Sequence, residues 1–141
     1  MTSLIEAAEF AVKESQKLGA DEAEGFAQKQ RVTEILLERG EIQSERTKTQ
    51  QGIGIRVIKD RKLGFAFAST LNRRFVKKTC RDAFKIASVS PENSDWVSLP
   101  LPKKVPPVPK GLYDEELANL SPNDVLSMVT VSYTHLTLPT N

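Results

Sequence analysis

The chain has 141 residues, of which 39% are hydrophobic and 27% are charged, and its formal net charge at pH 7 is +2. This composition is ordinary for a globular protein with one domain and a trailing segment. The sequence predicts neither a membrane-spanning segment nor a secretory leader, so we expect a cytoplasmic location. The single cysteine, Cys80, has no partner for an internal disulfide, which agrees with a reducing compartment.

The first predicted element is an amphipathic helix that begins after Ser3 and ends at Gly19. Ser3 and Glu6 have the spacing of a capping box, in which each side chain accepts a hydrogen bond from the other residue's backbone amide. Apolar residues then recur at helical spacing, and a glycine directly after them is a typical helix end.

Strands are predicted over residues 22–30 and 32–39, and a polar strand over 42–48 follows a turn at Gly40. A second helix, capped by Ser69 or Thr70, is predicted to end near Ala87. With the hairpin that lies between the polar strand and this helix, the order of elements predicts an α+β fold. We expect an antiparallel sheet of four or five strands with two helices packed on one face.

The hairpin is predicted over residues 52–69, GIGIRVIKDRKLGFAFAS, with a charged turn at 59–62. Large apolar residues alternate with small ones on both sides of the turn, which is the period of a strand with one buried face. Small residues on the opposite face allow another backbone, a ligand or a peptide to approach closely. The candidate substrate or assembly surface consists of Gly52, Gly54, Arg56, Gly64, Phe65 and Ser69.

Residues 46–85 contain twelve basic and two acidic side chains, a local net charge of +10. Such a block is either a solvated surface or a nucleic-acid footprint. The aromatic residues of this block have the spacing of core residues rather than of exposed stacking platforms, which favours the solvated surface. These residues are Phe65, Phe67, Phe75 and Phe84.

The C-terminal third differs in character from the rest of the chain. A Pro-rich connecting segment is predicted over 89–120, in which Trp96 anchors the segment to the sheet. The run Ser121-Pro122-Asn123-Asp124 predicts a helix start, and we expect residues 121–129 to be the beginning of a truncated helix that ends near Val129. We interpret residues 130–141 as a non-native tail and expect the native reading frame to stop near Met128.

No catalytic, metal-binding or cofactor-binding residue is predicted within the chain. The only histidine, His135, lies in the suspect tail, and Cys80 lies on a helix face, where a small buried residue is expected. A zinc peptidase needs about three protein ligands. The pair Gly52 and Gly54 is not a phosphate loop, because the next element is a strand rather than a helix.

Several motifs together resemble the N-terminal domain of the TldD/PmbA metallopeptidase family. They are GADEAE at residues 19–24, the hairpin GIGIRVIKDRKLGFAFAST, the helix that ends at Ala87, and a Leu-Tyr-Asp…Leu-Ser-Pro segment that looks more like the PmbA half. The resemblance covers residues 1–129, with a family-type domain over 1–88. The sequence departs from the family pattern at Lys62, where a turn glycine is frequent, and at Phe67, which is an extra aromatic residue.

The resemblance implies that zinc is bound by a His-Glu-x-x-x-His helix in a C-terminal domain that is not part of this chain. The chain would then be the non-catalytic N-terminal part of a peptidase, or of its partner subunit, acting in proteolysis of unfolded or leader peptides. It would form a homo- or heterodimer with a TldD/PmbA-type subunit, shape the substrate chamber and be inactive alone. Peptide could add along a strand edge. The alternative is a free-standing nucleic-acid-binding module that uses the block over 46–85, which a steep salt dependence would support.

Overall fold

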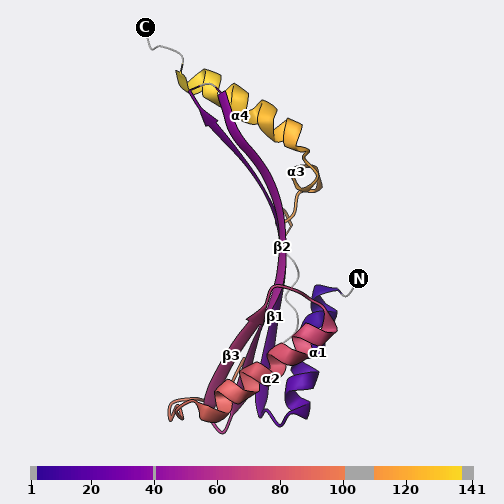
Figure 1. Cartoon of the computed structure of the whole chain (residues 1–141), viewed down its shortest axis with the longest axis vertical. Coiled ribbons are helices and arrows are strands. Elements are labelled where there is room, and N and C mark those ends of the chain that lie inside the picture. Colours follow the sequence, from indigo (N-terminus) through magenta and orange to yellow (C-terminus); the bar gives the residue numbers. More distant parts are fainter. Residues whose placement is uncertain (1–2, 40, 101–109, 138–141) are drawn as a thin grey trace. The chain divides into compact units, whose positions relative to one another are not determined.

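A computed structural model describes residues 3–39, 41–100 and 110–137 of the chain (Figure 1). Three strands form one sheet in the order β1-β2-β3, and β2 and β3 are antiparallel. In the described ranges no helix is long and apolar enough to cross a membrane. The elements are α1 (Leu4–Lys17), β1 (Glu22–Glu38), β2 (Glu41–Lys59), β3 (Lys62–Ala68), α2 (Arg73–Val89), α3 (Glu115–Ala118) and α4 (Pro122–Thr137).

The residue contacts divide the chain into two compact units, and the division passes through β1 and β2. The first unit consists of Met1–Gln30 and Gln50–Pro102, and the second of Arg31–Thr49 and Lys103–Asn141. The first unit therefore contains α1, α2, β3 and the adjoining parts of β1 and β2. It holds all the candidate surface residues predicted from the sequence.

The prediction of four or five strands is wrong, because the described residues form three. The strands predicted over 22–30 and 32–39 form one continuous strand, β1. The polar strand predicted over 42–48 likewise continues into the first strand of the hairpin, and together they form β2. Polar pairs bridge β1 and β2 at one expected break and just beyond it. The Gln30 amide donates to Gln50 Oε1 at 2.9 Å, and the hydroxyls of Thr33 and Thr47 lie 3.1 Å apart.

The predicted capping box of α1 is confirmed. The Glu6 backbone amide donates to Ser3 Oγ at 3.1 Å, and the Ser3 amide donates to Glu6 Oε2 at 2.8 Å. At the other end Gly19 has a φ of +97°, a conformation that a glycine adopts at little cost. The helix therefore begins and ends where the sequence indicates.

The predicted start of the second helix is wrong by two or three residues. Asn72, rather than Ser69 or Thr70, is the N-cap of α2, and its Oδ1 accepts a hydrogen bond from the Arg74 amide at 2.9 Å. Thr70 instead accepts a hydrogen bond from the Asn72 amide through its hydroxyl. Because Leu71 is buried in the core, the chain stays extended past it before the helix begins.

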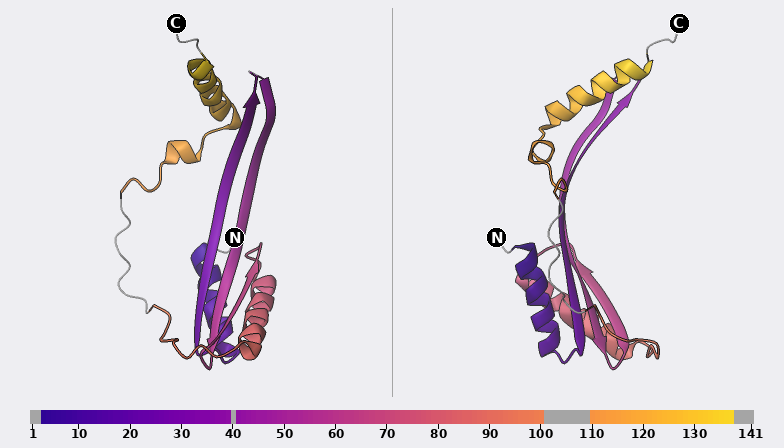
Figure 2. Two further views of the ribbon diagram at one scale, coloured as in Figure 1. Left: turned by 90° about the vertical axis from the view of Figure 1, so that its left-hand side faces the viewer. Right: turned by 180° about the vertical axis from the view of Figure 1, so that it is seen from behind.

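Both helices pack on one face of the sheet, as predicted. The core joins Ile53, Ile55 and Val57 of β2 to alanines of α1 and to the buried side of α2. Figure 2 shows α2 running alongside β3. In the outer strands, β1 and β3, the residues that face the helices are small. A Cβ on Gly25 of β1, for example, would lie 2.9 Å from the carbonyl oxygen of Ala8 in α1.

The predicted position of Gly64 on the uncovered face is wrong. Val57 pairs with Gly64 and Ile55 with Ala66, so these small residues share the helix-facing side of the sheet with the β2 core residues. A Cβ on Gly64 would lie 2.0 Å from Ala83 O of α2. The strand therefore turns its small residues toward the helix, because only they allow α2 to approach this closely.

The C-terminal third agrees in part with the sequence. Trp96 anchors the segment after α2 as predicted, since its indole N–H donates to Glu22 Oε1 at 2.9 Å. The short helix α3 lies inside the expected connecting segment, whose residues 101–109 lie outside the described ranges.

The expected helix end near Val129 is also wrong, because α4 continues to Thr137. The hydroxyls of Thr130, Ser132 and Thr134 donate to carbonyl oxygens four residues earlier, so these side chains are accommodated within the helix. Residues 138–141 of the suspected tail lie outside the described ranges.

Substitution of Gly64 by alanine should destabilise the first unit. The added methyl group would overlap the α2 backbone, and we expect the free energy of unfolding to fall by about 3 kcal/mol. Gly54→Ala is the matched control, because its Cβ would meet only the movable Phe65 ring at 3.2 Å. Denaturant titration of both variants measures the difference, and equal losses would contradict this packing.

Candidate functional site

The candidate site is the sheet face of the first unit that lies opposite α1 and α2, called here the open face. Alternation along each strand brings side chains from all three strands to it. Three phenylalanines on this face, Phe26, Phe65 and Phe67, are 66%, 51% and 72% exposed. The open face comprises Glu24, Phe26, Gln28, Gln30, Gln50, Gly52, Gly54, Arg56, Phe65, Phe67 and Ser69.

A groove of about 340 Å³ lies on the open face. The three phenylalanines supply its apolar surface, and Gly52 and Gly54 of the middle strand contribute no side chain to fill it. Around them lie hydrogen-bonding groups that carry no charge, namely Gln28, Gln30, Gln50, Gln51 and Ser69. The groove can therefore hold an apolar group while its amides bind polar atoms beside it.

The two glycines serve different purposes. A Cβ on Gly54 would lie 3.2 Å from two atoms of the Phe65 ring, so a side chain there would compete with the ring for the space above the strand. A Cβ on Gly52 would lie 2.8 Å from Ala68 O of the neighbouring strand. Gly52 is therefore required by the approach of the β3 backbone, whereas Gly54 keeps the groove open.

A second hollow, of about 290 Å³, adjoins the groove at its charged end. Arg56 and Glu24 form an ion pair across it, with 3.2 Å between Nη1 and Oε2. Both side chains are almost half exposed, so the pair contributes less than about 1 kcal/mol to stability. These groups remain accessible to a bound molecule.

The structure brings together most of the surface predicted from sequence. Gly52, Gly54, Phe65 and Ser69 line the groove, and Arg56 lines the hollow. Gly64 does not belong to the site. Sequence reasoning missed Phe26, the glutamines and Phe67 as an exposed residue. The alternation of polar residues with Phe26 along 22–30 was a usable signal, but only the pairing of β1 with β2 places that ring beside Gly54.

The hairpin that carries the site is fixed at its turn. Asp60 and Arg61 have φ values of +51° and +57°, which two successive turn residues adopt in a type I′ hairpin. Asp21 supports this turn: Oδ2 accepts from the Asp60 amide at 2.7 Å, and Oδ1 lies 3.0 Å from Lys59 Nζ. These hydrogen bonds, the backbone one first, hold the pKa of Asp21 below its usual value. Arg61 also pairs with Glu92, beyond α2.

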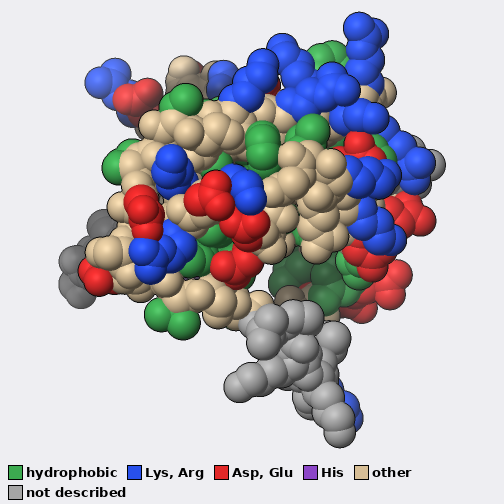
Figure 3. All heavy atoms as spheres, turned by 90° about the horizontal axis from the view of Figure 1, so that it is seen from below, with side chains coloured by type: hydrophobic (Ala, Val, Ile, Leu, Met, Phe, Trp, Pro, Cys, Tyr) green, Lys and Arg blue, Asp and Glu red, His purple; other side chains and the backbone are tan. Residues whose placement is uncertain are grey.

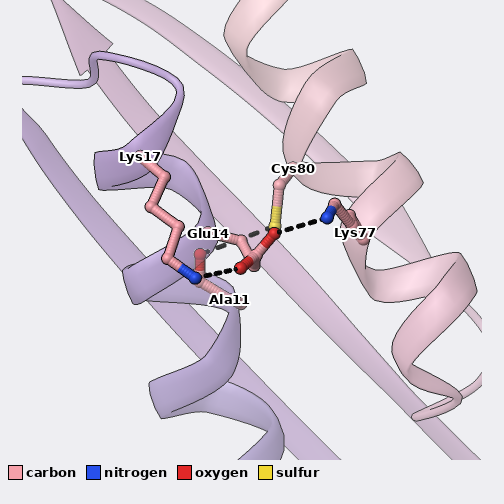
Figure 4. Close-up of polar contacts among 5 residues, drawn as sticks. All are labelled: Ala11, Glu14, Lys17, Lys77 and Cys80. Atoms are coloured by element: carbon pink, nitrogen blue, oxygen red, sulfur yellow. Dashed lines mark hydrogen bonds and ion pairs between the residues drawn. The ribbon is translucent and has the colours of Figure 1, made fainter.

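Cys80 is a structural residue at the contact between α1 and α2 (Figure 4). It is fully buried, its thiol donates to Ala11 O at 3.5 Å, and burial raises its pKa. Beside it the buried Glu14 carboxylate binds Lys17 Nζ at 2.7 Å and Lys77 Nζ at 3.3 Å. Hydrogen bonding to Lys17 is the main reason that the pKa of Glu14 is lowered.

The described residues do not fit a zinc site. In the ranges 3–39, 41–100 and 110–137, no three His, Cys, Asp or Glu side chains are grouped so that they could hold a metal ion. His135 lies in the last turn of α4 and is exposed. Within those ranges neither His135 nor Cys80 belongs to a group of three such side chains.

Comparison with known proteins shows which family and which solved structures the chain is similar to. Residues 23–87 match the family model described as PmbA/TldA metallopeptidase domain 1. The chain is similar to the crystal structure of TldE from Thermococcus kodakarensis, with 33% sequence identity and a TM-score of 0.79, over 92% of this chain and 28% of that one. No curated protein matches the sequence.

A second structure shows the same fold. It comes from Bacteroides thetaiotaomicron VPI-5482 and is described as that of a proposed modulator of DNA gyrase. The TM-score is 0.80 at 19% identity, and the match covers 96% of this chain and 31% of that one. The chain thus spans less than a third of the length of either structure.

Replacement of Asp21 by asparagine should remove part of the acid sensitivity of the fold. Because the folded pKa of Asp21 is lowered, its carboxylate contributes stability above about pH 4 that is lost as the pH falls through the folded pKa. Asp21→Asn should therefore lower the melting temperature at pH 7 and reduce its fall toward pH 2. A melting temperature that falls equally steeply in both proteins would disprove this contribution.

Proposed function

This chain belongs to the TldD/PmbA family through residues 23–87, and we propose that it is the N-terminal, non-catalytic part of a TldD/PmbA-type metallopeptidase or of its partner subunit. In this role its sheet shapes the place where a peptide is held before cleavage. The observation that carries the proposal is the groove on the open face.

The groove and the neighbouring strand edge suit an extended peptide. In the described part of the chain, β3 is the last strand of the sheet and pairs beyond β2 only at Lys62, with Glu92. A peptide that pairs with the rest of this edge would direct alternate side chains onto the open face, beside Phe65 and Phe67. Backbone pairing tolerates many sequences, which suits the processing of unfolded or leader peptides.

The same face also suits a contact between subunits. Three adjoining phenylalanines that are each at least half exposed form the kind of apolar surface that marks an interaction site. A TldD/PmbA-type subunit, identical or different, is the partner we propose, and the two surfaces would enclose the peptide between them. Zinc and the cleavage step belong, in this proposal, to parts of the parent protein other than these 141 residues.

The prediction that Phe65, Phe67 and Phe75 occupy core positions is wrong, because all three are exposed. The spacing of these aromatic residues therefore no longer counts against nucleic-acid binding. A single-strand platform combines aromatic rings with cations that follow the backbone. At the groove the two are separated: Phe65 and Phe67 share the open face with Arg56, which is paired with Glu24, whereas the cations of α2 lie on the other side of the sheet together with Phe75. This separation favours peptide over nucleic acid at the groove.

The 141-residue chain should show no peptidase activity, with or without added zinc. A fluorogenic peptide assay with and without a chelator measures this directly. Cleavage that rises with zinc and disappears with chelator would refute the non-catalytic assignment.

Truncation of Phe67 should weaken peptide binding to the groove. We expect Phe67→Ala to raise the Kd for a labelled, extended apolar peptide about tenfold, because it removes one wall of the groove. Ile5→Ala is the control, since Ile5 is 72% exposed on α1, away from the open face. Fluorescence anisotropy provides the measurement, and a labelled oligonucleotide tests the alternative. Equal effects of the two variants, or tighter oligonucleotide binding that depends on Phe67, would count against the proposal.

A further inference from the structure

Helix α2 carries a charge distribution that its own folding does not favour. It contains six Lys or Arg residues and one acidic residue, Asp82. Its first turn has no acidic residue and includes Arg73 and Arg74, although the N-terminus of a helix favours negative charge. In the view from below, Lys and Arg side chains gather along one margin of the surface (Figure 3).

Two of the six cations serve the packing of α1 against α2. Lys77 Nζ lies 3.3 Å from Glu14 Oε2, and the Arg73 guanidinium lies 5.2 Å from the centroid of the Phe10 ring. The other four have no ion pair with any residue in the described ranges. They are Arg74, Lys78, Arg81 and Lys85, called here the basic stripe.

The basic stripe runs straight along the helix. Its members are separated by four, three and four residues, which places them within about 60° of the helix circumference and over about 17 Å of its length. They lie opposite the buried side of α2, formed by Val76, Ala83 and others, and all four are exposed.

This arrangement opposes helix stability. Arg74 and Lys78, Lys78 and Arg81, and Arg81 and Lys85 are like-charged pairs three or four residues apart, and such pairs destabilise a helix. Among the described residues no carboxylate forms an ion pair with them, and the one acidic residue of α2, Asp82, lies beside the stripe rather than on it. Folding does not account for a line of unpaired cations, whereas an anionic partner would.

Apolar side chains follow the stripe on the side away from α1. Phe75, Ile86 and Val89 are 53%, 43% and 85% exposed. Helical spacing places all three on one flank of the stripe, with Asp82 among them. A nucleic-acid backbone would meet the Asp82 carboxylate, and of the three apolar side chains only Phe75 is an aromatic ring on which a base could stack. An amphipathic helix with carboxylates along one row and apolar residues along the next complements both features.

We infer that the outer face of α2 is a docking surface for an acidic amphipathic helix of a partner protein. Glutamates at intervals of four, three and four residues in that helix pair with the basic stripe, and its apolar row covers Phe75, Ile86 and Val89. The surface is separate from the groove on the open face, so its partner and the peptide bind independently.

The test uses the whole chain and a labelled helical peptide of about 18 residues with glutamates at those intervals and leucines on the adjoining row. The variant Lys78→Gln/Lys85→Gln should weaken binding about tenfold, as measured by fluorescence anisotropy at low salt. The control variant Lys13→Gln/Lys29→Gln makes the same change in net charge at exposed positions on α1 and β1 and should retain the affinity. The stripe variant should melt no lower than the parent, because it relieves repulsion.

Three results would overturn the inference. The first is that the acidic peptide does not bind at low salt. The second is that the stripe variant and the control variant lose affinity equally, which would make net charge the cause. The third is that an oligonucleotide of similar charge binds more tightly than the peptide and depends on the same two lysines. Peptide variants with glutamine in place of glutamate should bind at least about tenfold more weakly if the inference holds.

Discussion

The arrangement of the first unit depends on the close approach of α2 to β3 at Gly64. The helix backbone at Ala83 and Ala87 occupies the space in which any side chain at this position would lie. Because successive residues of a strand point to opposite faces, this one contact also directs Phe65 and Phe67 outward. The packing of the core and the aromatic character of the open face therefore have the same cause. A larger residue at the contact would disturb both.

Local signals account for the features that the sequence predicted well. The capping box of Ser3 and Glu6, the glycine at the end of α1 and the position of the hairpin all depend on residues close in sequence. Which residues of β3 face the helices does not depend on such local signals. In the segment GFAFA the alternation is the same whether the phenylalanines or the small residues face the helices. The usual preference for large apolar residues in the core selects the wrong alternative. The deciding factor is the space that α2 leaves, which only the tertiary structure defines.

The candidate site shows the same limit. Gly52, Gly54, Phe65 and Ser69 belong to one hairpin, so their proximity can be inferred from the sequence, and all four line the groove. Phe26 reaches the groove from a strand more than twenty residues earlier, through the pairing of β1 with β2. That pairing is long-range, and its polar contacts between Gln30 and Gln50 lie where a break was expected. The site was therefore about half predictable.

The contact between Glu22 and Trp96 makes tryptophan fluorescence a probe of one local contact in the protein. One carboxylate accepts hydrogen bonds from the indole and from the backbone amide of Leu99, so the first residue of β1 holds a segment more than seventy residues later in the chain. Trp96 is the only tryptophan. Its emission therefore reports on the attachment of this one segment, and a release of the tether that precedes global unfolding would appear as a separate transition.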